Sequence, residues 1–299
     1  MINQITITND NINLNVITYD LNNPSAILIH LHGLGNHFQP ISEFDTEESF
    51  ISFETRTKYL LPLNIKSYGL ELRGHGLSSG TRFMVNSIDE YISDINCLVE
   101  YIVIYHPKIP IYIIGESLGG ALSIKYCITY KDIISGIILM GPMCGISMQT
   151  YTKQFSLYFL LALSYIYPSY EISLRGDKSS YLSSSNEKYY KAKINCKYTN
   201  HNKIRANTAR ECYYITLWID KNINLLTTPI IAFHSKNDMI TNPDITKDII
   251  NRCSSVDKEC IITDIGDHLL LIHMNDDDTQ PCEIMTMIYN WLNKMLNNK

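Results

Sequence analysis

The sequence predicts an α/β fold with a doubly wound, mostly parallel sheet, because short apolar runs alternate with longer helix-like stretches. The runs are almost unbroken by polar residues, as expected for strands that are covered on both faces. These runs span residues 26–32, 111–114, 133–140 and 230–234. The helix-like stretches include 87–105 and 118–130. Polar and apolar residues also alternate on both sides of residues 9–11, which predicts an opening antiparallel hairpin.

The buried-strand runs stop between about residues 142 and 224. We therefore predict a helical lid of residues 142–224, inserted between core segments 1–141 and 225–299. Its apolar segment, residues 155–163, is much shorter than the roughly 20 residues of a membrane-spanning helix. This segment is either a helix of the core or a lid face that lines an acyl pocket and makes transient contact with a membrane surface. On the second interpretation, Leu160 and Leu163 bind the acyl chain of a substrate.

Composition excludes some classes of function. The chain has 299 residues, a net charge of −5 and no basic tract, so it offers no positive field for nucleic acid. Its eight cysteines are scattered without Cys-x-x-Cys pairs, which predicts neither a metal site nor a disulfide scaffold. The first residues lack the basic and apolar regions of a secretion signal. We expect a cytoplasmic protein, and the sequence does not indicate its oligomeric state.

A serine stands at the junction of a predicted strand and a predicted helix. The pentapeptide Gly-Glu-Ser-Leu-Gly at 115–119 follows the run 111–114 and precedes the helical stretch. Glycines two residues before and after the serine let the strand and helix approach each other closely, so the strained turn exposes the hydroxyl. The positive end of the helix points at the same place. This context predicts that Ser117 is a nucleophile.

A serine nucleophile needs a general base and an acid that orients it. Asp238 lies in the loop after the strand 229–234, and His268 lies in the loop after a predicted strand 260–265. The order Ser, Asp, His along the chain is that of a known triad arrangement. Asp238 could instead be a helix cap or a turn residue.

Other residues compete for these roles. His273 lies in an apolar run and His234 lies inside a strand, where it points into the layers of the sheet, so we prefer His268 as the base. Asp264 and Asp267 are close to His268 in sequence and are substitutes for Asp238 if that residue is misplaced.

Backbone amides must also stabilise the negative charge that develops on the substrate. His-Gly-Leu-Gly at 32–35 follows the first buried strand, and its glycines permit a close approach of the main chain. We predict that the amides of Leu34 and Leu118 form this oxyanion hole.

With these motifs, the chain resembles the monoacylglycerol lipase and lysophospholipase group of the α/β-hydrolase superfamily, also called serine aminopeptidase-like hydrolases. The resemblance covers about residues 25–291 and rests on segments 32–37, 73–78, 115–119 and 141–142 together with the loops of Asp238 and His268. It implies the triad and the oxyanion donors named above, and a structural role for His75.

The chain departs from the group at several positions. Animal members carry Glu where this chain has Asn36, and a second His where it has Leu271, and those groups help to hold glycerol. Asn36 is therefore a candidate substrate-binding residue with an altered preference. Glu71 replaces the usual Asp, which we expect to be a mild change. An acidic insertion within about residues 41–58 is either a solvated helix face or a source of repulsion for anionic substrates.

The sequence thus predicts a serine hydrolase that cleaves carboxylic esters of lipid-like substrates, a monoacylglycerol or a lysophospholipid, through an acyl-enzyme. It requires no metal or organic cofactor. Two alternatives remain open. One is a thioesterase, peptidase or acyltransferase on the same scaffold, and the other is a binding protein without catalytic activity.

Overall fold

The computed structural model describes residues 2–39, 52–145, 161–172, 189, 193, 195–199, 203–272 and 280–297, with the side chains of 280–282 left out. The predicted substrate contact Leu160, the competitor His273 and the acidic cluster at 43–48 lie outside the described residues. Within the described part, eight strands form one sheet in the order β1-β2-β4-β3-β5-β6-β9-β10.

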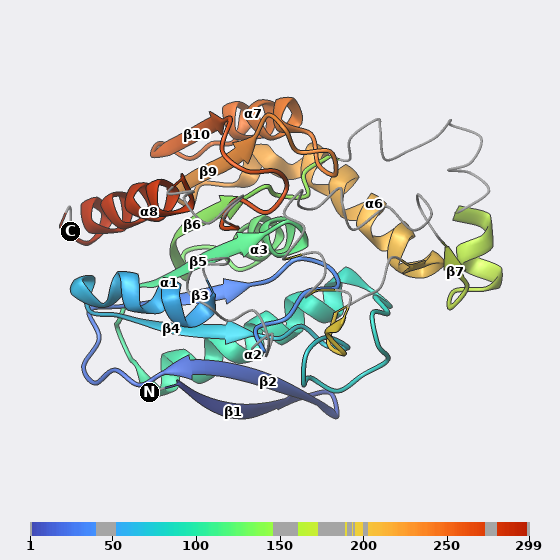
Figure 1. The fold of residues 1–299 in the computed structure, drawn as a ribbon, viewed down its shortest axis with the longest axis horizontal. Coiled ribbons are helices and arrows are strands. Elements are labelled where there is room, and N and C mark those ends of the chain that lie inside the picture. The colour runs from blue at the N-terminus through green and yellow to red at the C-terminus, as the bar shows by residue number, and fades with distance from the viewer. Residues whose placement is uncertain are drawn as a thin grey trace.

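The strands are β1 (Ile2–Asn9), β2 (Ile12–Tyr19), β3 (Ala26–Leu31), β4 (Ile65–Leu70), β5 (Ile111–Glu116), β6 (Ile134–Met140), β9 (Ile230–Ser235) and β10 (Lys258–Thr263). β2 runs antiparallel to β1 and β4, and every other pairing is parallel. A separate two-stranded ladder joins β7 (Glu171–Ile172) to β8 (Ile204–Arg205). Figure 1 shows β1 and β2 at one edge of the large sheet and β10 beside α7 at the other. The predicted mostly parallel α/β sheet is confirmed.

The helices are α1 (Phe53–Leu60), α2 (Ile88–Tyr105), α3 (Leu118–Thr129), α6 (Ala206–Asn222), α7 (Pro243–Arg252) and α8 (Gln280–Asn297), with 3₁₀ turns η1 (Leu61–Leu63) and η3 (Ile223–Leu225). Apolar residues of α2, α3, α6 and α7 form one core cluster with one face of the sheet. Residues of α1 and α8 form a second cluster with the other face. The sheet is therefore covered on both sides, as its apolar runs require.

Local signals explain where several elements begin. In the opening hairpin, Asp10 and Asn11 both have positive φ, 47° and 63°, which is the conformation that a two-residue turn of twisted strands needs. The Ser87 hydroxyl caps α2 by accepting from the Asp89 amide at 3.1 Å. Asn242 caps α7 in the same way, with Pro243 in its first turn. These caps satisfy amides that a helix cannot pair internally.

Two strands differ from the sequence prediction. β10 begins and ends two residues before the predicted 260–265. β4 was not predicted, because Lys66, Ser67 and Gly69 interrupt its apolar pattern, although it lies in the middle of the sheet between β2 and β3.

The lid prediction concerns residues 142–224, of which the structure describes a part. The helical residues 161–166 precede β7, and Figure 1 shows α6 extending from the sheet toward β7. Cys212, Ile215 and Ile219 of α6 lie in the same core cluster as α3. α6 therefore anchors the predicted lid on the sheet, and the exact boundaries stay a prediction. None of the helices among the described residues is both long and apolar enough to cross a membrane.

Candidate active site

Ser117 occupies a strained turn between β5 and α3. Its φ of 50° and ψ of −113° lie in a region that residues with side chains rarely adopt. The main chain holds the turn on both sides, because the Ser117 amide donates to the Met140 carbonyl at 3.0 Å and its carbonyl accepts from the Met143 amide at 2.9 Å. The side chain does not cap α3. The half-buried hydroxyl is therefore presented to the site and not used to hold the helix.

The two outer glycines of the pentapeptide are required by close packing. A β-carbon added at Gly115 would lie 2.4 Å from the Gly119 carbonyl oxygen, and one added at Gly119 would lie 2.2 Å from the Leu31 carbonyl oxygen. Both distances are far shorter than a van der Waals contact. The atoms contacted belong to the main chain, which cannot move aside as a flexible side chain can. The strand and helix reach this geometry only with glycine at both positions, as the sequence predicted.

The glycine-rich loop after β3 lies against the serine. A β-carbon added at Gly33 would lie 3.1 Å from Cβ and 3.8 Å from Oγ of Ser117. Among the described residues, the amides of Leu34 and Leu118 have no hydrogen-bond acceptor. Two unpaired amides on the two segments that flank the Ser117 hydroxyl are suited to bind an oxyanion.

His32 links this loop to the turn after β4. Its Nε2 accepts from the Leu72 amide at 3.1 Å, so Nδ1 carries the proton and donates to the Gly33 carbonyl at 2.8 Å. Burial, and to a lesser degree His75, lower the pKa of His32 well below its usual value. A neutral ring is the form that can make both hydrogen bonds.

Glu71 is the second support of the loop. Its buried carboxylate accepts from the Phe38 amide at 3.0 Å, from the Gln39 side chain at 3.1 Å and from the Leu77 amide at 2.6 Å. The Asn15 side chain donates to it at 3.0 Å. Because Phe38 and Gln39 follow the loop directly, this carboxylate ties the oxyanion segment to the turn at 73–78. Whether the Asp-to-Glu difference is a mild change stays a prediction. The Glu71 side chain holds two segments of the chain together through these hydrogen bonds.

Asp238 and His268 meet at the carboxyl end of the sheet. His268 Nδ1 lies 2.7 Å from Asp238 Oδ2, and both residues are buried. The other carboxylate oxygen, Oδ1, accepts from the amides of Ile240 at 2.7 Å and Thr241 at 2.9 Å. These bonds fix the carboxylate so that it holds the Nδ1–H tautomer of His268, and Nε2 then remains available as a base.

The electrostatics of Asp238 favour the ionised form. Burial alone would raise the pKa of the Asp238 carboxyl, but the charge of His268 and the hydrogen bonds from His234 and His268 outweigh burial and hold the pKa below its usual value. The carboxylate therefore stays charged across the physiological range. It is able to stabilise an imidazolium at His268.

Residues 141–143 connect Ser117 with the pair formed by His268 and Asp238. A β-carbon added at Gly141 would lie 3.5 Å from His268 Nδ1 and 3.4 Å from Asp238 Oδ2. Two residues later, the Met143 amide binds the Ser117 carbonyl. Between described atoms, the Ser117 hydroxyl and the His268 ring share no hydrogen bond. Bonds of this kind often close only when substrate binds.

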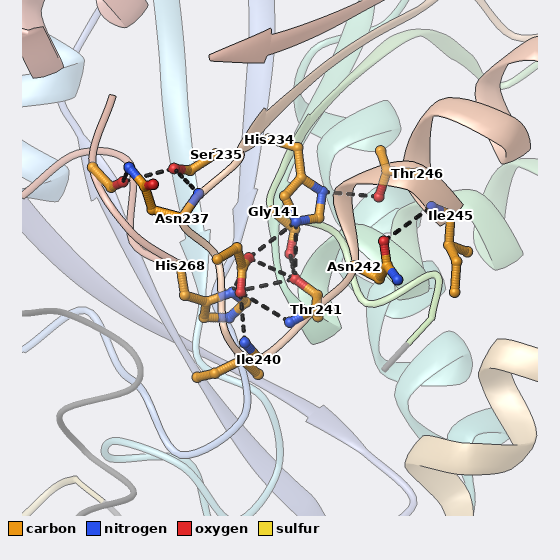
Figure 2. A network of polar contacts seen from close by, with 12 residues as sticks. Gly141, His234, Ser235, Asn237, Ile240, Thr241, Asn242, Ile245, Thr246 and His268 are labelled. Atoms are coloured by element: carbon orange, nitrogen blue, oxygen red, sulfur yellow. Dashed lines mark hydrogen bonds and ion pairs between the residues drawn. The ribbon is translucent and has the colours of Figure 1, made fainter. Parts of the chain in front are cut away.

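Two side chains near Asp238 were missed as parts of the site. Thr241 Oγ1 donates to Asp238 Oδ2 at 2.7 Å, and His234 Nε2 lies 3.0 Å from the same oxygen (Figure 2). His234 is buried inside β9, as the sequence analysis expected, but it contacts the acid of the site and not only the sheet layers. The spacing of four residues between His234 and Asp238 was the available signal.

The remaining candidates lie around the site. The Asn36 amide closes a turn onto the Gly33 carbonyl at 3.1 Å, which places this half-buried residue on the oxyanion loop. Leu163 packs with Ala206 and Ala209 in a small cluster within the predicted lid. Asp264 is exposed and paired with Lys236 at 3.0 Å, and the acid that contacts His268 is Asp238. The roles of Asn36 and Leu163 in substrate binding stay predictions.

Comparison with protein families gives a match over residues 22–275 to a hydrolase family described as serine aminopeptidase, S33. The match covers most of the chain, including Ser117, Asp238 and His268. The chain belongs to this family. The resemblance seen in the sequence motifs is thereby confirmed at the level of the family.

Relatives and solved structures agree with this placement. A monoglyceride lipase homolog of Monkeypox virus is 24% identical over 226 residues, which are 76% of this chain and 74% of that protein. Monoglyceride lipase of Mus musculus is 28% identical over 120 residues, which are 40% of this chain and 36% of that protein. A soluble variant of monoglyceride lipase from Saccharomyces cerevisiae superposes with a TM-score of 0.81 at 19% identity, over 97% of this chain and 94% of that one. Monoacylglycerol lipase of Paleococcus ferrophilus gives 0.76 at 20% identity, over 96% and 99%. The structural likenesses establish the α/β-hydrolase fold.

Proposed function

We propose that the protein is a serine hydrolase of carboxylic esters, with Ser117, Asp238 and His268 as its catalytic triad. The observation that carries the proposal is the buried 2.7 Å contact between His268 and Asp238 at the sheet edge where Ser117 is held in a strained turn. A simple turn serine would have no need of that strain. The names of the relatives, which include several monoglyceride lipases, support ester hydrolysis.

The proposed roles give the following steps of acyl transfer. Ser117 Oγ attacks the ester carbonyl while His268 Nε2 takes its proton, and Asp238 stabilises the imidazolium that forms. The amides of Leu34 and Leu118 donate to the oxyanion. The intermediate then collapses, His268 returns the proton to the leaving alcohol, and an acyl group stays on Ser117. Water, deprotonated by His268, releases the acid and restores the serine.

For the substrate we propose a monoacylglycerol or a lysophospholipid. Support comes from the similarity to monoglyceride lipases and from exposed apolar residues in the predicted lid: Tyr165, Ile166 and Tyr167 are 62–68% exposed. Such a surface is suited to transient contact with a lipid layer. Asn36 replaces a polar residue of animal relatives, so the head-group preference is the property we expect to differ.

We also propose that the protein acts in the cytoplasm. The seven cysteines whose side chains are described are all free thiols, several of them buried, and free buried thiols fit a reducing compartment. Fractionation of cells that express the protein would locate it.

The central test is turnover of monoacylglycerols, lysophospholipids and short p-nitrophenyl esters by wild type and Ser117→Ala. We expect kcat to fall on the order of 10⁶ in the variant. Ser254→Ala is the matched control, because Ser254 is exposed and bonds only the Asn224 carbonyl at 2.6 Å among the interactions described. Ester hydrolysis retained by Ser117→Ala would refute the assignment.

The same assay separates the alternatives. Added alcohol that competes with water for the acyl-enzyme would indicate an acyltransferase. Cleavage of thioesters or peptides in preference to oxygen esters would change the substrate class but not the triad. A folded wild-type protein that neither hydrolyses esters nor reacts with a fluorophosphonate would indicate a binding protein.

A further inference from the structure

The acid of the site contacts two histidines. Asp238 Oδ2 lies 2.7 Å from His268 Nδ1 and 3.0 Å from His234 Nε2. Thr241 Oγ1 is a third donor to the same oxygen, at 2.7 Å. Figure 2 shows His234, Thr241 and His268 close together, and Thr241 Oγ1 lies 3.2 Å from His234 Nε2 and 3.3 Å from His268 Nδ1. One oxygen thus shares its negative charge among three donors.

The contacts of His234 determine which ring nitrogen carries the proton. An ionised carboxylate only accepts, so Nε2 of His234 carries a proton and donates to Asp238. Nδ1 lies 2.9 Å from Thr246 Oγ1, and in a neutral ring it accepts the proton of that hydroxyl. His234 and Thr246 are both fully buried, so water does not replace either bond. The bonds run in one direction, from Thr246 on α7 through His234 to Asp238.

We propose that His234 is a positioning residue that sets the orientation and the effective charge of Asp238 toward His268. This inference rests on the function proposed above and assigns His234 no contact with substrate. The carboxylate lies in a loop, where the amides of Ile240 and Thr241 hold Oδ1. His234 belongs to β9, which pairs with β6 on one side and β10 on the other, and it holds Oδ2. It therefore fixes the position of the loop carboxylate relative to the sheet.

The bond from His234 also has an electrostatic consequence. Each donor to Oδ2 reduces the charge that the carboxylate presents to the other donors. Without His234, Asp238 would stabilise the imidazolium of His268 more strongly, and the base would stay protonated to a higher pH. Loss of His234 therefore moves the acid limb of kcat/KM upward, while looser orientation lowers kcat.

Other ionisable groups surround the cluster without contacting His234. They are the exposed Asp244, Lys247 and Asp248 on α7, the surface pair Lys236–Asp264, half-buried Asp267, and the thiols Cys144 and Cys260. Burial raises the pKa of Cys144 to about 12 and that of Cys260 to about 11. Surface carboxylates and amines ordinarily titrate outside pH 5–9. A shift of the acid limb within that window thus reports on the histidine–aspartate cluster.

The test compares His234→Leu with His234→Gln in the full chain. Leucine removes the donor, whereas the glutamine amide reaches the position of Nε2 and donates without being able to carry charge. For His234→Leu we expect kcat to fall about tenfold, KM to stay within about twofold, and the acid limb to rise by about half a pH unit. For His234→Gln we expect all three values to lie near wild type. If His234 had only a structural role, the acid limb would not shift in His234→Leu and return to the wild-type position in His234→Gln.

Two further variants keep the test decisive. His30→Leu removes another buried strand histidine, which bonds Ser67 at 3.3 Å and has no bond to Asp238 among the described residues, so its acid limb should match wild type. If His234→Leu does not fold, Thr246→Val takes its place, because valine keeps the shape and removes the donor to Nδ1. We then expect a smaller shift in the same direction.

The outcomes separate this inference from the proposed function. An unchanged acid limb and kcat in folded His234→Leu, or in Thr246→Val when His234→Leu is unfolded, would overturn the role of His234. A glutamine variant as impaired as leucine would do the same. If wild type has no turnover and no fluorophosphonate reactivity, the proposed function fails. Nitrogen NMR of ring protonation at His268 in wild type and His234→Leu then still tests the inference.

Discussion

The serine side and the histidine side of the site are held in different ways. Around Ser117, the main chain and the absence of side chains at Gly115 and Gly119 determine the geometry. Around His268, side-chain and amide hydrogen bonds to Asp238 determine it. Close-packed main chain has no space for an added atom, so any larger side chain must move the backbone. A hydrogen-bond network, in contrast, can lose one bond while the others remain. We therefore expect abrupt effects of substitution on the serine side and graded, pH-dependent effects on the histidine side.

The largest expected effect outside Ser117 tests the charge on the histidine side. In Asp238→Asn, the amide nitrogen or oxygen replaces the oxygen that binds His268, and the negative charge is lost. We expect kcat to fall about 10⁴-fold while the fold is retained. Steady-state kinetics over pH 5–9 and circular dichroism would measure both. A loss below about tenfold would mean that Asp238 is not the orienting acid.

The next effect tests the steric control of the serine side. In Gly119→Ala, the new methyl would lie within 2.2 Å of the Leu31 carbonyl oxygen, so α3 or β3 must shift and the Leu118 amide with it. We expect kcat to fall about 10²-fold or more and the free energy of unfolding to fall by about 1–3 kcal/mol. Thr129→Ala, at the exposed end of the same helix, is the control. Near-normal turnover in Gly119→Ala would show that the turn is less constrained than its contacts indicate.

A weaker effect tests whether a side-chain network also supports the oxyanion loop. In Glu71→Gln, an amide nitrogen must face at least one of the donors from Phe38, Gln39, Leu77 or Asn15. We expect the free energy of unfolding to fall by about 1–3 kcal/mol and kcat to fall about tenfold, with little change in KM. Urea unfolding and kinetics would measure these quantities. Glu259→Gln at the exposed start of β10 is the matched control, and equal effects of the two would contradict the role of Glu71.

The effect that is smallest at neutral pH concerns buried histidines beside the oxyanion loop. Burial lowers the pKa of His37 and of His75 to about 4, whereas the unfolded chain binds these protons near pH 6.5. Between these values the unfolded state binds more protons, so stability falls as the pH is lowered, by about 1.4 kcal/mol per pH unit for each histidine. Unfolding free energies at pH 4.5, 5.5 and 7.5 would show this slope.

His75→Asn sharpens the same measurement. Its amide nitrogen is able to replace Nδ1, which donates to the Arg73 carbonyl at 3.1 Å, but it does not titrate. In this variant, the slope of the unfolding free energy against pH should be smaller by the contribution of one histidine, about 1.4 kcal/mol per pH unit. A slope equal to that of wild type would mean that His75 is already protonated or exposed in the folded protein.

Short apolar runs predicted most of the sheet but not β4. Strands β3, β5, β6 and β9 lie where the runs are, because a strand covered on both faces has apolar residues at nearly every position. β4 has Lys66, Ser67 and Gly69, yet it is central. Ser67 is tolerated there because it receives a hydrogen-bond partner, His30, from the neighbouring strand. That compensation depends on strand order, which a local pattern does not contain.

The sequence alone determined the segments that flank the site. The glycine spacing around Ser117, the loop glycine at Gly33 and the loops of Asp238 and His268 are local, because backbone geometry at a strand end is encoded by neighbouring residues. Their roles as a triad stay a prediction.

Only the tertiary structure decided which groups support them. Glu71, which follows β4, reaches Asn15 on β2 and Phe38 in the loop after β3. His234 and Asp238 are neighbours in the sequence, but the partner of His234 on α7, Thr246, comes from the packing. Buried polar groups of this kind take their partners from whatever the packing brings within about 3 Å. That proximity is set by the order of the strands and by the layers above them, and no local pattern of residue types encodes it.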